Sequence, residues 1–223
     1  MRAGTGRHVK DALYDQFARI GRALGSPKRV EILDLLCQGE RTVESIARAA
    51  GMGGTNTSAH LQALRAARLV ETRKEGTKVF YRIADDDVCR FFFGLRDLAR
   101  GRLAEVEQIA RDFFRARDEL EPIADEELLG RLRRREVVLV DVRPPEEYRA
   151  GHIPGAISLP LSELTDRLND LPRDAEVVAY CRGPYCVLAP LALEVLRTNG
   201  FRARRLEYGF PEWRLAGLPV ATG

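Results

Sequence analysis

The stretch VVAYCRGPYC, residues 177–186, decides the fold of the second half of this chain. An unbroken apolar run leads directly into Cys181. Pro190 must lie in or near the first turn of the helix that follows, because a proline inside a helix removes an amide donor and clashes with the preceding turn. A strand, a compact loop and a helix in this order are typical of a parallel α/β sheet, which binds ligands at the carboxyl ends of its strands. We therefore expect Cys181 to lie at a ligand site.

The loop at residues 181–186 favours an anionic sulfur atom. Its backbone amides can converge on Cys181, while Arg182 and the dipole of the following helix add positive potential. We therefore predict a lowered pKa and a nucleophilic thiol at Cys181. The loop residues expected to bind the anion are Arg182, Gly183, Pro184, Tyr185 and Cys186.

A zinc site, a permanent disulfide and a phosphatase loop are the other roles considered for the cysteines of this loop, and each is disfavoured. Zinc would need two more ligands, but His152 is the only histidine in this half of the chain. A permanent disulfide is disfavoured in a reducing cytosol, and a phosphatase loop would carry arginine where Val187 stands. We therefore predict no metal and no cofactor. Cys186 keeps two interpretations, because it either acts as a resolving thiol toward Cys181 or serves as a buried structural residue.

Strands and helices alternate on both sides of this loop. Continuous apolar runs predict strands, and apolar positions at helical spacing predict helices. The expected strands lie at residues 137–142, 177–181 and 204–206, and the expected helices at residues 125–133, within 162–171 and at 191–200. This alternation predicts a parallel sheet with helices on both faces.

The first half of the chain has a different pattern, in which helices and tight turns precede a hairpin. Apolar positions at helical spacing predict a first helix from residue 13 and a second from Pro27. Thr42 can cap a third, short helix, and a glycine-rich turn leads from it to a fourth helix that begins near Asn56. Residues 70–83 alternate between apolar and polar and contain a glycine at their turn, which predicts a β-hairpin.

The fourth helix has one packing face and one free polar face. Steps of 100° place Ser58, Gln62 and Arg65 in one sector, from which short polar side chains can reach a DNA major groove. Residues 41–82 hold eight Lys/Arg against three Asp/Glu, and the hairpin can lie along the DNA backbone. The alternative interpretation of this polar face is an ordinary solvated surface. For His60, the alternative to a DNA contact is a packed, structural role. The expected DNA-binding residues are Thr55, Asn56, Ser58, His60, Gln62, Arg65, Arg73, Lys74 and Lys78.

A last long helix is predicted from residue 88 to about residue 114, with its apolar positions on one face. At 1.5 Å per residue it would run about 40 Å. A small domain cannot bury so long an apolar face alone, so a partner helix must cover it. We therefore predict a homodimer that forms through the first and last helices of the N-terminal domain.

The fourth helix and the hairpin carry a resemblance to a known family. TNTSAHLQALRAARLVETRKEGTKVFYRI, residues 55–83, resembles the recognition helix and wing of the ArsR/SmtB family of winged-helix repressors. The likeness covers about residues 10–115 and implies binding to operator DNA. The metal sites of that family are not reproduced. Thr42 and Glu44 stand where the third helix would carry a thiolate site, and the last helix lacks the family's Asp, His and Glu set.

Two further cysteines lie in elements that serve one branch of this family. Some members sense sulfur with one cysteine in the second helix and one in the last helix, and Cys37 and Cys89 fall in these elements. The resemblance therefore makes Cys37 and Cys89 a candidate thiol sensor. The alternative is that each is a small buried apolar residue, the usual role of a lone cysteine on an apolar helix face.

The second half of the chain resembles a rhodanese domain over about residues 122–221. The segments that carry this resemblance are VVLVDVRPPEEYRAGHIPGAISLP (residues 137–160), YCRGPYC (residues 180–186) and EYGFPEWRLAGLPV (residues 207–220). The resemblance implies that Cys181 accepts a sulfane sulfur atom as a persulfide, which the loop amides stabilise. Asp141 and Arg143 resemble the buried pair that supports the loop, and an ordinary structural ion pair is the simpler interpretation.

These patterns together predict two domains. A mainly α winged helix-turn-helix domain of the α+β type is expected at residues 1–118, and a rhodanese-like α/β domain with three layers and a parallel sheet at residues 126–223. The polar residues 119–125 form the expected linker. The net charge is +3. Neither a run of about 18 apolar residues nor a signal-peptide pattern is present, so we expect a cytoplasmic protein without membrane contact.

The expected function is a DNA-binding transcriptional regulator, a repressor. Its rhodanese domain would accept sulfane sulfur from a persulfide, polysulfide or thiosulfate, or sense the redox state, at Cys181. The alternative is a sulfurtransferase enzyme that passes sulfur to a thiol or cyanide, with a DNA-binding domain that localises or autoregulates it. A redox switch that uses only a disulfide between Cys181 and Cys186 is a third interpretation.

Overall fold

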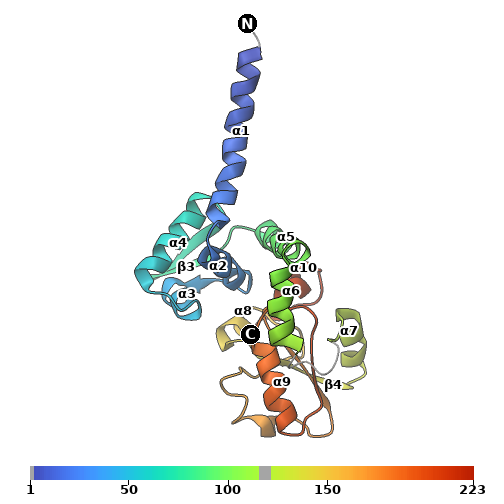
Figure 1. Ribbon diagram of the computed structural model, residues 1–223. Coiled ribbons are helices and arrows are strands. Elements are labelled where there is room, and N and C mark those ends of the chain that lie inside the picture. The colour runs from blue at the N-terminus through green and yellow to red at the C-terminus, as the bar shows by residue number, and fades with distance from the viewer. Residues whose placement is uncertain (1–2, 116–121) are drawn as a thin grey trace. The chain divides into compact units, whose positions relative to one another are not determined.

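The computed structural model describes residues 3–115 and 122–223 (Figure 1). The chain divides into two compact units, residues 1–92 and 93–223, and the division falls inside helix α5 (Asp86–Arg102). The linker predicted at residues 119–125 lies partly outside the described residues. The predicted fold class is confirmed, since the first unit is a winged helix-turn-helix and the second contains a parallel α/β sheet.

Four helices open the first unit in the predicted order: α1 (Ala3–Leu24), α2 (Pro27–Cys37), α3 (Val43–Ala49) and α4 (Gly54–Ala66). Helix α1 begins well before residue 13, where the apolar pattern starts. The Thr42 hydroxyl accepts a hydrogen bond from the Ser45 amide at 3.3 Å, so the predicted cap of α3 is present. Helix α4 starts earlier than predicted, because Gly53 has the extended backbone of an N-cap residue.

The wing of the first unit is an antiparallel hairpin with one short additional strand. Strands β2 (Val70–Glu75) and β3 (Lys78–Ile83) pair along their length, and β1 (Arg41–Thr42) adds to the other edge of β3. Gly76 adopts a positive φ of 58° at the turn, a conformation that favours glycine. The hairpin prediction is therefore confirmed.

The prediction of one continuous helix from residue 88 to about 114 is wrong. Helix α5 ends at Arg102, and a separate helix α6 (Ala104–Ala110) continues into a π-helical turn (Arg111–Arg115). Leu103 breaks the helix because its backbone is extended, with φ −111° and ψ 106°. The acidic Glu105 and Glu107 lie in the first turn of α6, where a helix N-terminus favours negative charge.

The second unit contains a four-stranded parallel sheet in the order β5-β4-β6-β7. Its strands are β4 (Val137–Asp141), β5 (Ile157–Ser158), β6 (Glu176–Tyr180) and β7 (Ala203–Arg205), and its helices beyond α6 are α7 (Asp125–Arg133), α8 (Pro145–Ala150), α9 (Leu188–Thr198) and α10 (Phe210–Leu215). The start of α9 at Leu188 places Pro190 in the first turn, as predicted.

Successive residues of β6 point to opposite cores. Val177 and Ala179 join the cluster that contains the buried face of α9, whereas Val178 and Tyr180 join the cluster that contains Trp213 of α10. This alternation produces the predicted three layers, because each face of the sheet is covered by helices.

A predicted helix within residues 162–171 is absent. This segment forms turns and one short 3₁₀ helix (Leu168–Asp170). Leu164, Leu168 and Leu171 are all buried against the sheet, so their apolar spacing serves core packing rather than an α-helix. Among the described residues, none of the helices combines the length and the apolar character that a membrane span requires.

Candidate thiol site and DNA-binding surface

The polar face predicted on α4 is open to solvent. Thr55, Asn56, Gln62 and Arg65 are exposed, and Ser58 and His60 are half-buried. The Gln62 amide nitrogen donates to the Tyr81 hydroxyl at 3.3 Å, which ties the recognition helix to the wing. The exposure of this face is compatible with groove binding, which stays a prediction.

The three basic residues predicted to contact phosphate on the wing differ in their surroundings. Lys74 and Lys78 are exposed near the turn of the hairpin. Arg73 donates hydrogen bonds to Glu40 at 3.0 Å and to Glu75 at 2.7 Å. These hydrogen bonds raise the pKa of Arg73, and its charge is partly compensated within the wing. Lys74 and Lys78 are therefore the better candidates for phosphate contact.

The structure brings the candidate sensor cysteines of the first unit together. Cys37 at the end of α2 and Cys89 in α5 form a disulfide, with 5.9 Å between their Cα atoms. Their exposed fractions are 2% and 0%. The two cysteines are therefore one disulfide-bonded pair between two helices rather than two unrelated apolar residues.

Cys181 lies where the sequence predicts it, directly after β6, and it is 4% exposed. The loop closes over it through a hydrogen bond from the Cys186 amide to the Gly183 carbonyl at 3.1 Å. The Cys181 thiol points to two carbonyl oxygens, those of Gly183 at 3.8 Å and Cys186 at 3.7 Å. The loop thus brings both thiols into one small buried site.

The prediction of a lowered pKa at Cys181 is wrong. Burial raises the pKa of the Cys181 thiol well above its ordinary value, and the hydrogen bond and charge of Cys186 raise it further. The pKa of Cys186 is lowered instead, mainly by the hydrogen bond from Cys181 and then by backbone amides and the charge of Arg182. Cys186 is therefore the thiol of the pair that ionises more readily, because burial opposes charge on Cys181.

The Arg182 guanidinium is paired with a carboxylate, so its charge is not directed at the sulfur atoms alone. Its guanidinium donates to the Glu147 carboxylate at 2.7 Å and 3.0 Å. Glu147 is 2% exposed, so this pair anchors the loop to α8 and compensates most of the charge that the sequence assigned to anion binding. The sequence did not predict this role for Glu147, because its partner Arg182 lies 35 residues away.

Asp141 and Arg143 form the predicted buried ion pair at the end of β4. Both side chains are fully buried, and the Arg143 Nε atom donates to Asp141 Oδ1 at 2.9 Å. Arg143 also donates to the Gly151 carbonyl at 2.7 Å and lies 4.5 Å from the ring centre of Phe210. Since the Phe210 amide donates to the Cys181 carbonyl at 3.2 Å, the pair supports the segment that holds the loop.

Gly209 and Glu212, in the segment 207–220, contact the loop, although the sequence did not predict a role for either residue. A Cβ atom on Gly209 would lie 2.3 Å from the Gly183 nitrogen, so only glycine fits there. The Gly209 amide donates to Glu212 Oε2 at 3.1 Å. Both residues fall in the segment that resembles the end of a rhodanese domain, which was the only signal available for them.

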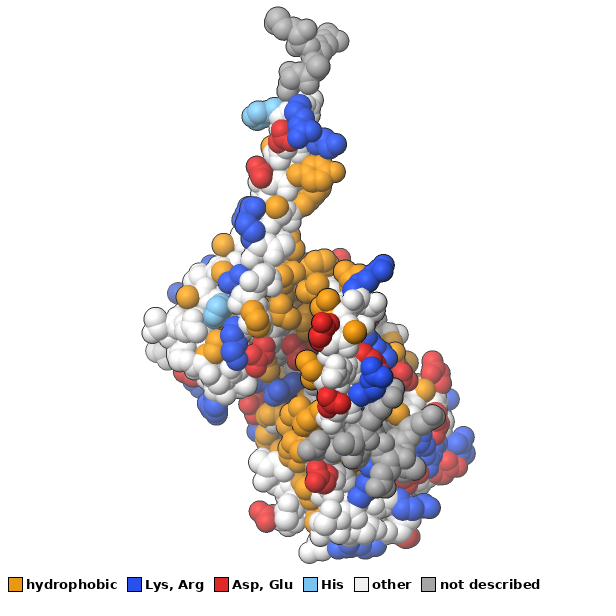
Figure 2. All heavy atoms as spheres, in the orientation of Figure 1, with side chains coloured by type: hydrophobic (Ala, Val, Ile, Leu, Met, Phe, Trp, Pro, Cys, Tyr) orange, Lys and Arg blue, Asp and Glu red, His pale blue; other side chains and the backbone are white. Residues whose placement is uncertain are grey.

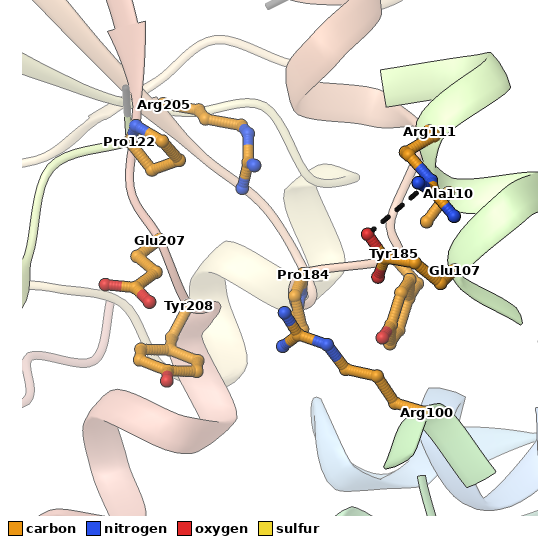
Figure 3. Close-up of a pocket in the computed structure, with 10 residues that line it drawn as sticks. All are labelled: Arg100, Glu107, Ala110, Arg111, Pro122, Pro184, Tyr185, Arg205, Glu207 and Tyr208. Carbon is orange, nitrogen blue, oxygen red and sulfur yellow. Dashed lines mark ion pairs between the residues drawn. The ribbon is translucent and has the colours of Figure 1, made fainter. Parts of the chain in front are cut away.

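A pocket of about 250 Å³ adjoins the outer side of the loop (Figure 3). Pro184 and Tyr185 of the loop form part of its wall, and Arg100 and Arg205 extend into it from different elements. Arg111 lies 3.8 Å from Glu107 in an ion pair at its edge. The remaining lining residues are Ala110, Pro122, Glu207 and Tyr208. Three arginines against two glutamates make the pocket favourable for a small anion.

No group of three or more His, Cys, Asp or Glu side chains with metal-binding geometry occurs within residues 3–115 and 122–223. The folds of the two halves define a class of protein: a winged-helix DNA-binding unit joined to a rhodanese-like unit whose loop holds one buried and one half-buried thiol.

Comparisons with known proteins give the family. Residues 26–72 match the bacterial regulatory protein, arsR family, and residues 124–216 match the rhodanese-like domain. The HTH-type transcriptional regulator Rv0324 of Mycobacterium tuberculosis is 53% identical over 214 residues, which cover 96% of this chain and 94% of the relative. This protein therefore belongs to the family of ArsR-type transcriptional regulators that carry a C-terminal rhodanese-like domain.

Two further relatives each match one half of the chain. A sulfurtransferase of Allochromatium vinosum is 37% identical over 88 residues, covering 39% of this chain and 80% of that protein. A homodimeric winged helix-turn-helix DNA-binding domain from Mycobacterium bovis, solved as a fragment, is 54% identical with a TM-score of 0.41. It covers 42% of this chain and 87% of that chain.

Replacement of Asp141 by alanine should strongly destabilise the second unit, because it leaves the buried Arg143 charge uncompensated. We expect a loss of about 3–5 kcal/mol in the free energy of unfolding. Trp213 is the single tryptophan of the chain and lies in this unit, so its fluorescence during urea unfolding measures the change. Asp170→Ala, which breaks an exposed ion pair with Arg167, is the matched control and should cost less than about 1 kcal/mol. Equal effects of the two changes would contradict a supporting role for the buried pair.

Alkylation should follow the order of the two pKa values. At neutral pH a limiting amount of iodoacetamide should label Cys186 before Cys181, because the thiolate is the reactive form. Trypsin cleaves after Arg182 and places the two cysteines in different peptides, so mass spectrometry reads each label separately. Preferential labelling of Cys181 would show that the proton distribution is the reverse.

Proposed function

We propose that this protein is a cytoplasmic transcriptional repressor that responds to sulfane sulfur through the thiols of its rhodanese-like domain. The observation that carries the proposal is the pair of Cys181 and Cys186 in one loop, the first buried and the second half-buried, with the Cys181 thiol 3.7 Å from the Cys186 carbonyl oxygen. An enzyme that only accepts and releases sulfur at one cysteine has no need of a second thiol at that position. A sensor gains from it, because a resolving thiol turns sulfur exposure into a lasting change in the loop.

The chemistry can start from the protonated Cys181. Its sulfur attacks the terminal sulfur of a persulfide R–S–SH, the donor S–S bond breaks, and R–S⁻ leaves with the electron pair. Cys186 accepts the proton that Cys181 gives up, so Cys181 becomes a persulfide. After the leaving thiolate takes the proton from Cys186, the Cys186 thiolate attacks the inner sulfur of that persulfide. Hydrosulfide leaves and a disulfide remains, so two cysteine thiols are oxidised while the sulfane sulfur is reduced.

The pocket beside the loop supports an anionic sulfur donor. Persulfides, polysulfides and thiosulfate all carry negative charge at neutral pH, and Arg100 and Arg205 extend into this pocket (Figure 3). Such charges raise the local concentration of an anion. The donor is therefore proposed to be a small anionic sulfur compound.

Cys37 and Cys89, joined as a disulfide in the structure, supply a second cysteine pair that can pass between the disulfide and the dithiol form, and it is located in the DNA-binding unit. It joins α2 to α5, so its formation or reduction restricts or frees the movement of these helices. We propose that this pair also responds to reactive sulfur, and that the exposed polar face of α4 with Lys74 and Lys78 contacts operator DNA.

The likeness to a sulfurtransferase favours a second candidate function, in which the chain passes sulfur to a thiol or cyanide acceptor. The two candidates differ in stoichiometry. A sulfurtransferase turns over with thiosulfate and cyanide and produces thiocyanate continuously, whereas a sensor is loaded once per thiol site.

Polysulfide should modify Cys181 and weaken DNA binding together. Mass spectrometry should show addition of one sulfur atom at Cys181, followed by loss of two hydrogens as the disulfide with Cys186 forms. In a gel-shift assay with an operator selected from random duplexes, treated protein should bind about tenfold more weakly, a typical allosteric coupling. Cys181→Ser should abolish the response, and Cys186→Ser should retain the added sulfur.

An unchanged response of the Cys181→Ser protein would remove the rhodanese-like domain from the sensing mechanism. Continuous thiocyanate production without a change in DNA binding would favour the sulfurtransferase.

A homodimer is proposed from the exposed apolar face of α1. Val9, Leu13 and Phe17 recur every fourth residue, and their exposed fractions are 54%, 52% and 65%. Apolar side chains are visible along this helix in Figure 2. A contiguous apolar stripe of this kind marks an interaction site, and a second copy of the same helix supplies a matching stripe.

The double variant Leu13→Glu/Phe17→Glu should be monomeric, because it places charges in the proposed interface. Light scattering after size exclusion measures the mass, and the gel-shift assay should show a loss of operator affinity of about tenfold or more, since dimers bind paired half-sites. Gln16→Glu on the same helix is the control and should leave the mass unchanged. A monomeric wild-type protein would rule out this interface.

A further inference from the structure

One ion pair connects α10 to α5 in the second unit. Arg96 Nη1 lies 2.6 Å from Glu212 Oε1, and the two side chains are 15% and 13% exposed. Arg96 also covers the ring of Phe93, with 4.7 Å between the guanidinium carbon and the ring centre. Since the pair is largely shielded from water, breaking it would leave two poorly solvated charges.

The same Glu212 holds the backbone on which the thiol loop rests. Its second carboxylate oxygen accepts a hydrogen bond from the Gly209 amide at 3.1 Å. Gly209 lies so close to the loop that an added Cβ atom would be 2.3 Å from the carbonyl carbon of Arg182. The next residue, Phe210, donates its amide to the Cys181 carbonyl at 3.2 Å. A movement of the loop therefore moves the residue that binds Arg96.

Gly183 lies between the thiols and the ion pair. Its carbonyl accepts hydrogen bonds from the Cys181 thiol at 3.8 Å and from the Cys186 amide at 3.1 Å. On its other side, a Cβ atom on Gly183 would lie 3.2 Å from Glu212 Oε1 and 3.5 Å from Arg96 Nη1. Persulfide or disulfide formation removes the thiol hydrogen bond to this carbonyl, and the loop has little room to adjust without displacing the ion pair.

We infer that Arg96 and Glu212 form a positioning pair that transmits the chemical state of the Cys181 loop to helix α5. The inference rests on the proposed function and names its regulatory connection. Helix α5 runs from Asp86 to Arg102, so it carries both Arg96 and the sensor cysteine Cys89 of the DNA-binding unit. The two residues are seven positions apart, which is about two turns along this helix.

Arg96 has a second acidic neighbour in the same arrangement. Asp97 Oδ1 lies 3.7 Å from Arg96 Nε, and the Asp97 side chain is 69% exposed. If Glu212 shifts with the loop, Arg96 loses its shielded partner and keeps the exposed one.

The test uses the full-length protein and three variants. Arg96→Gln removes the charge, Arg96→Lys retains it, and Arg90→Gln is the matched control, because Arg90 lies on the same helix in an exposed ion pair with Asp87. In each protein, mass spectrometry measures sulfur addition at Cys181 and the gel-shift assay measures operator affinity before and after polysulfide treatment.

We expect all four proteins to accept sulfur at Cys181. Operator affinity should fall about tenfold in the wild type and in Arg90→Gln, less in Arg96→Lys, and less than about twofold in Arg96→Gln. A tenfold response in Arg96→Gln would overturn the inference while leaving the proposed function intact. Absence of sulfur at Cys181 in the wild type would instead contradict the proposed function.

A second measurement tests the link without DNA or sulfur. Diamide joins Cys181 to Cys186, and hydrogen exchange of residues 93–102 is compared between the protein with and without that disulfide. In the wild type, disulfide formation should raise the exchange rate of these residues at least threefold. Glu212→Gln keeps an acceptor for the Gly209 amide but lacks the charge that binds Arg96, so disulfide formation should not change the exchange rate in this variant. Equal exchange in both forms of the wild type would overturn the inference.

Discussion

The buried ion pair of Asp141 and Arg143 is the interaction on which the second unit depends. Two charges with no exposed surface are stable only when each satisfies the other, and Arg143 also binds the Gly151 carbonyl and covers Phe210. One guanidinium thereby joins the end of β4, the turn after α8 and the start of α10. These are the segments around the thiol loop, so the position of Cys181 is determined by electrostatics in a dry core as much as by the hydrophobic packing of the sheet.

That dry core also decides the chemistry of the loop. A thiol at the end of a strand and beside a helix N-terminus would ordinarily ionise easily, but burial opposes charge on Cys181. The pKa of Cys186 is lowered instead, first by the hydrogen bond from Cys181 and also by the nearby charge of Arg182. In the proposed function, the second thiol has two roles: it accepts the proton of Cys181, and it displaces sulfide from the Cys181 persulfide.

Helix α5 is the element through which we propose that this chemistry affects DNA binding. It is the element within which the two compact units divide, and it contains Cys89 near its start and Arg96 farther along. The disulfide with Cys37 and the ion pair with Glu212 hold the same helix by different bonds, one covalent and one ionic. In the proposed mechanism, sulfur at either cysteine pair would act on this one helix, which is the simplest physical form of coupling between the rhodanese-like and winged-helix units.

Local patterns in the sequence alone determined the first four helices and the hairpin, strands β4, β6 and β7, the cap at Thr42, the turn at Gly76, the start of α9 before Pro190 and the place of Cys181 after β6. Each follows from the preferences of neighbouring residues. Only the tertiary structure decided the break at Leu103, the partner of Arg182, the pairing of Cys37 with Cys89 and the proton distribution in the loop. These depend on burial and on contacts between residues 35, 52 and 116 positions apart, as in Arg182 with Glu147, Cys37 with Cys89 and Arg96 with Glu212. The spacing of residues along the chain does not predict such long-range contacts, because they form only when the folded core brings the side chains together and excludes water.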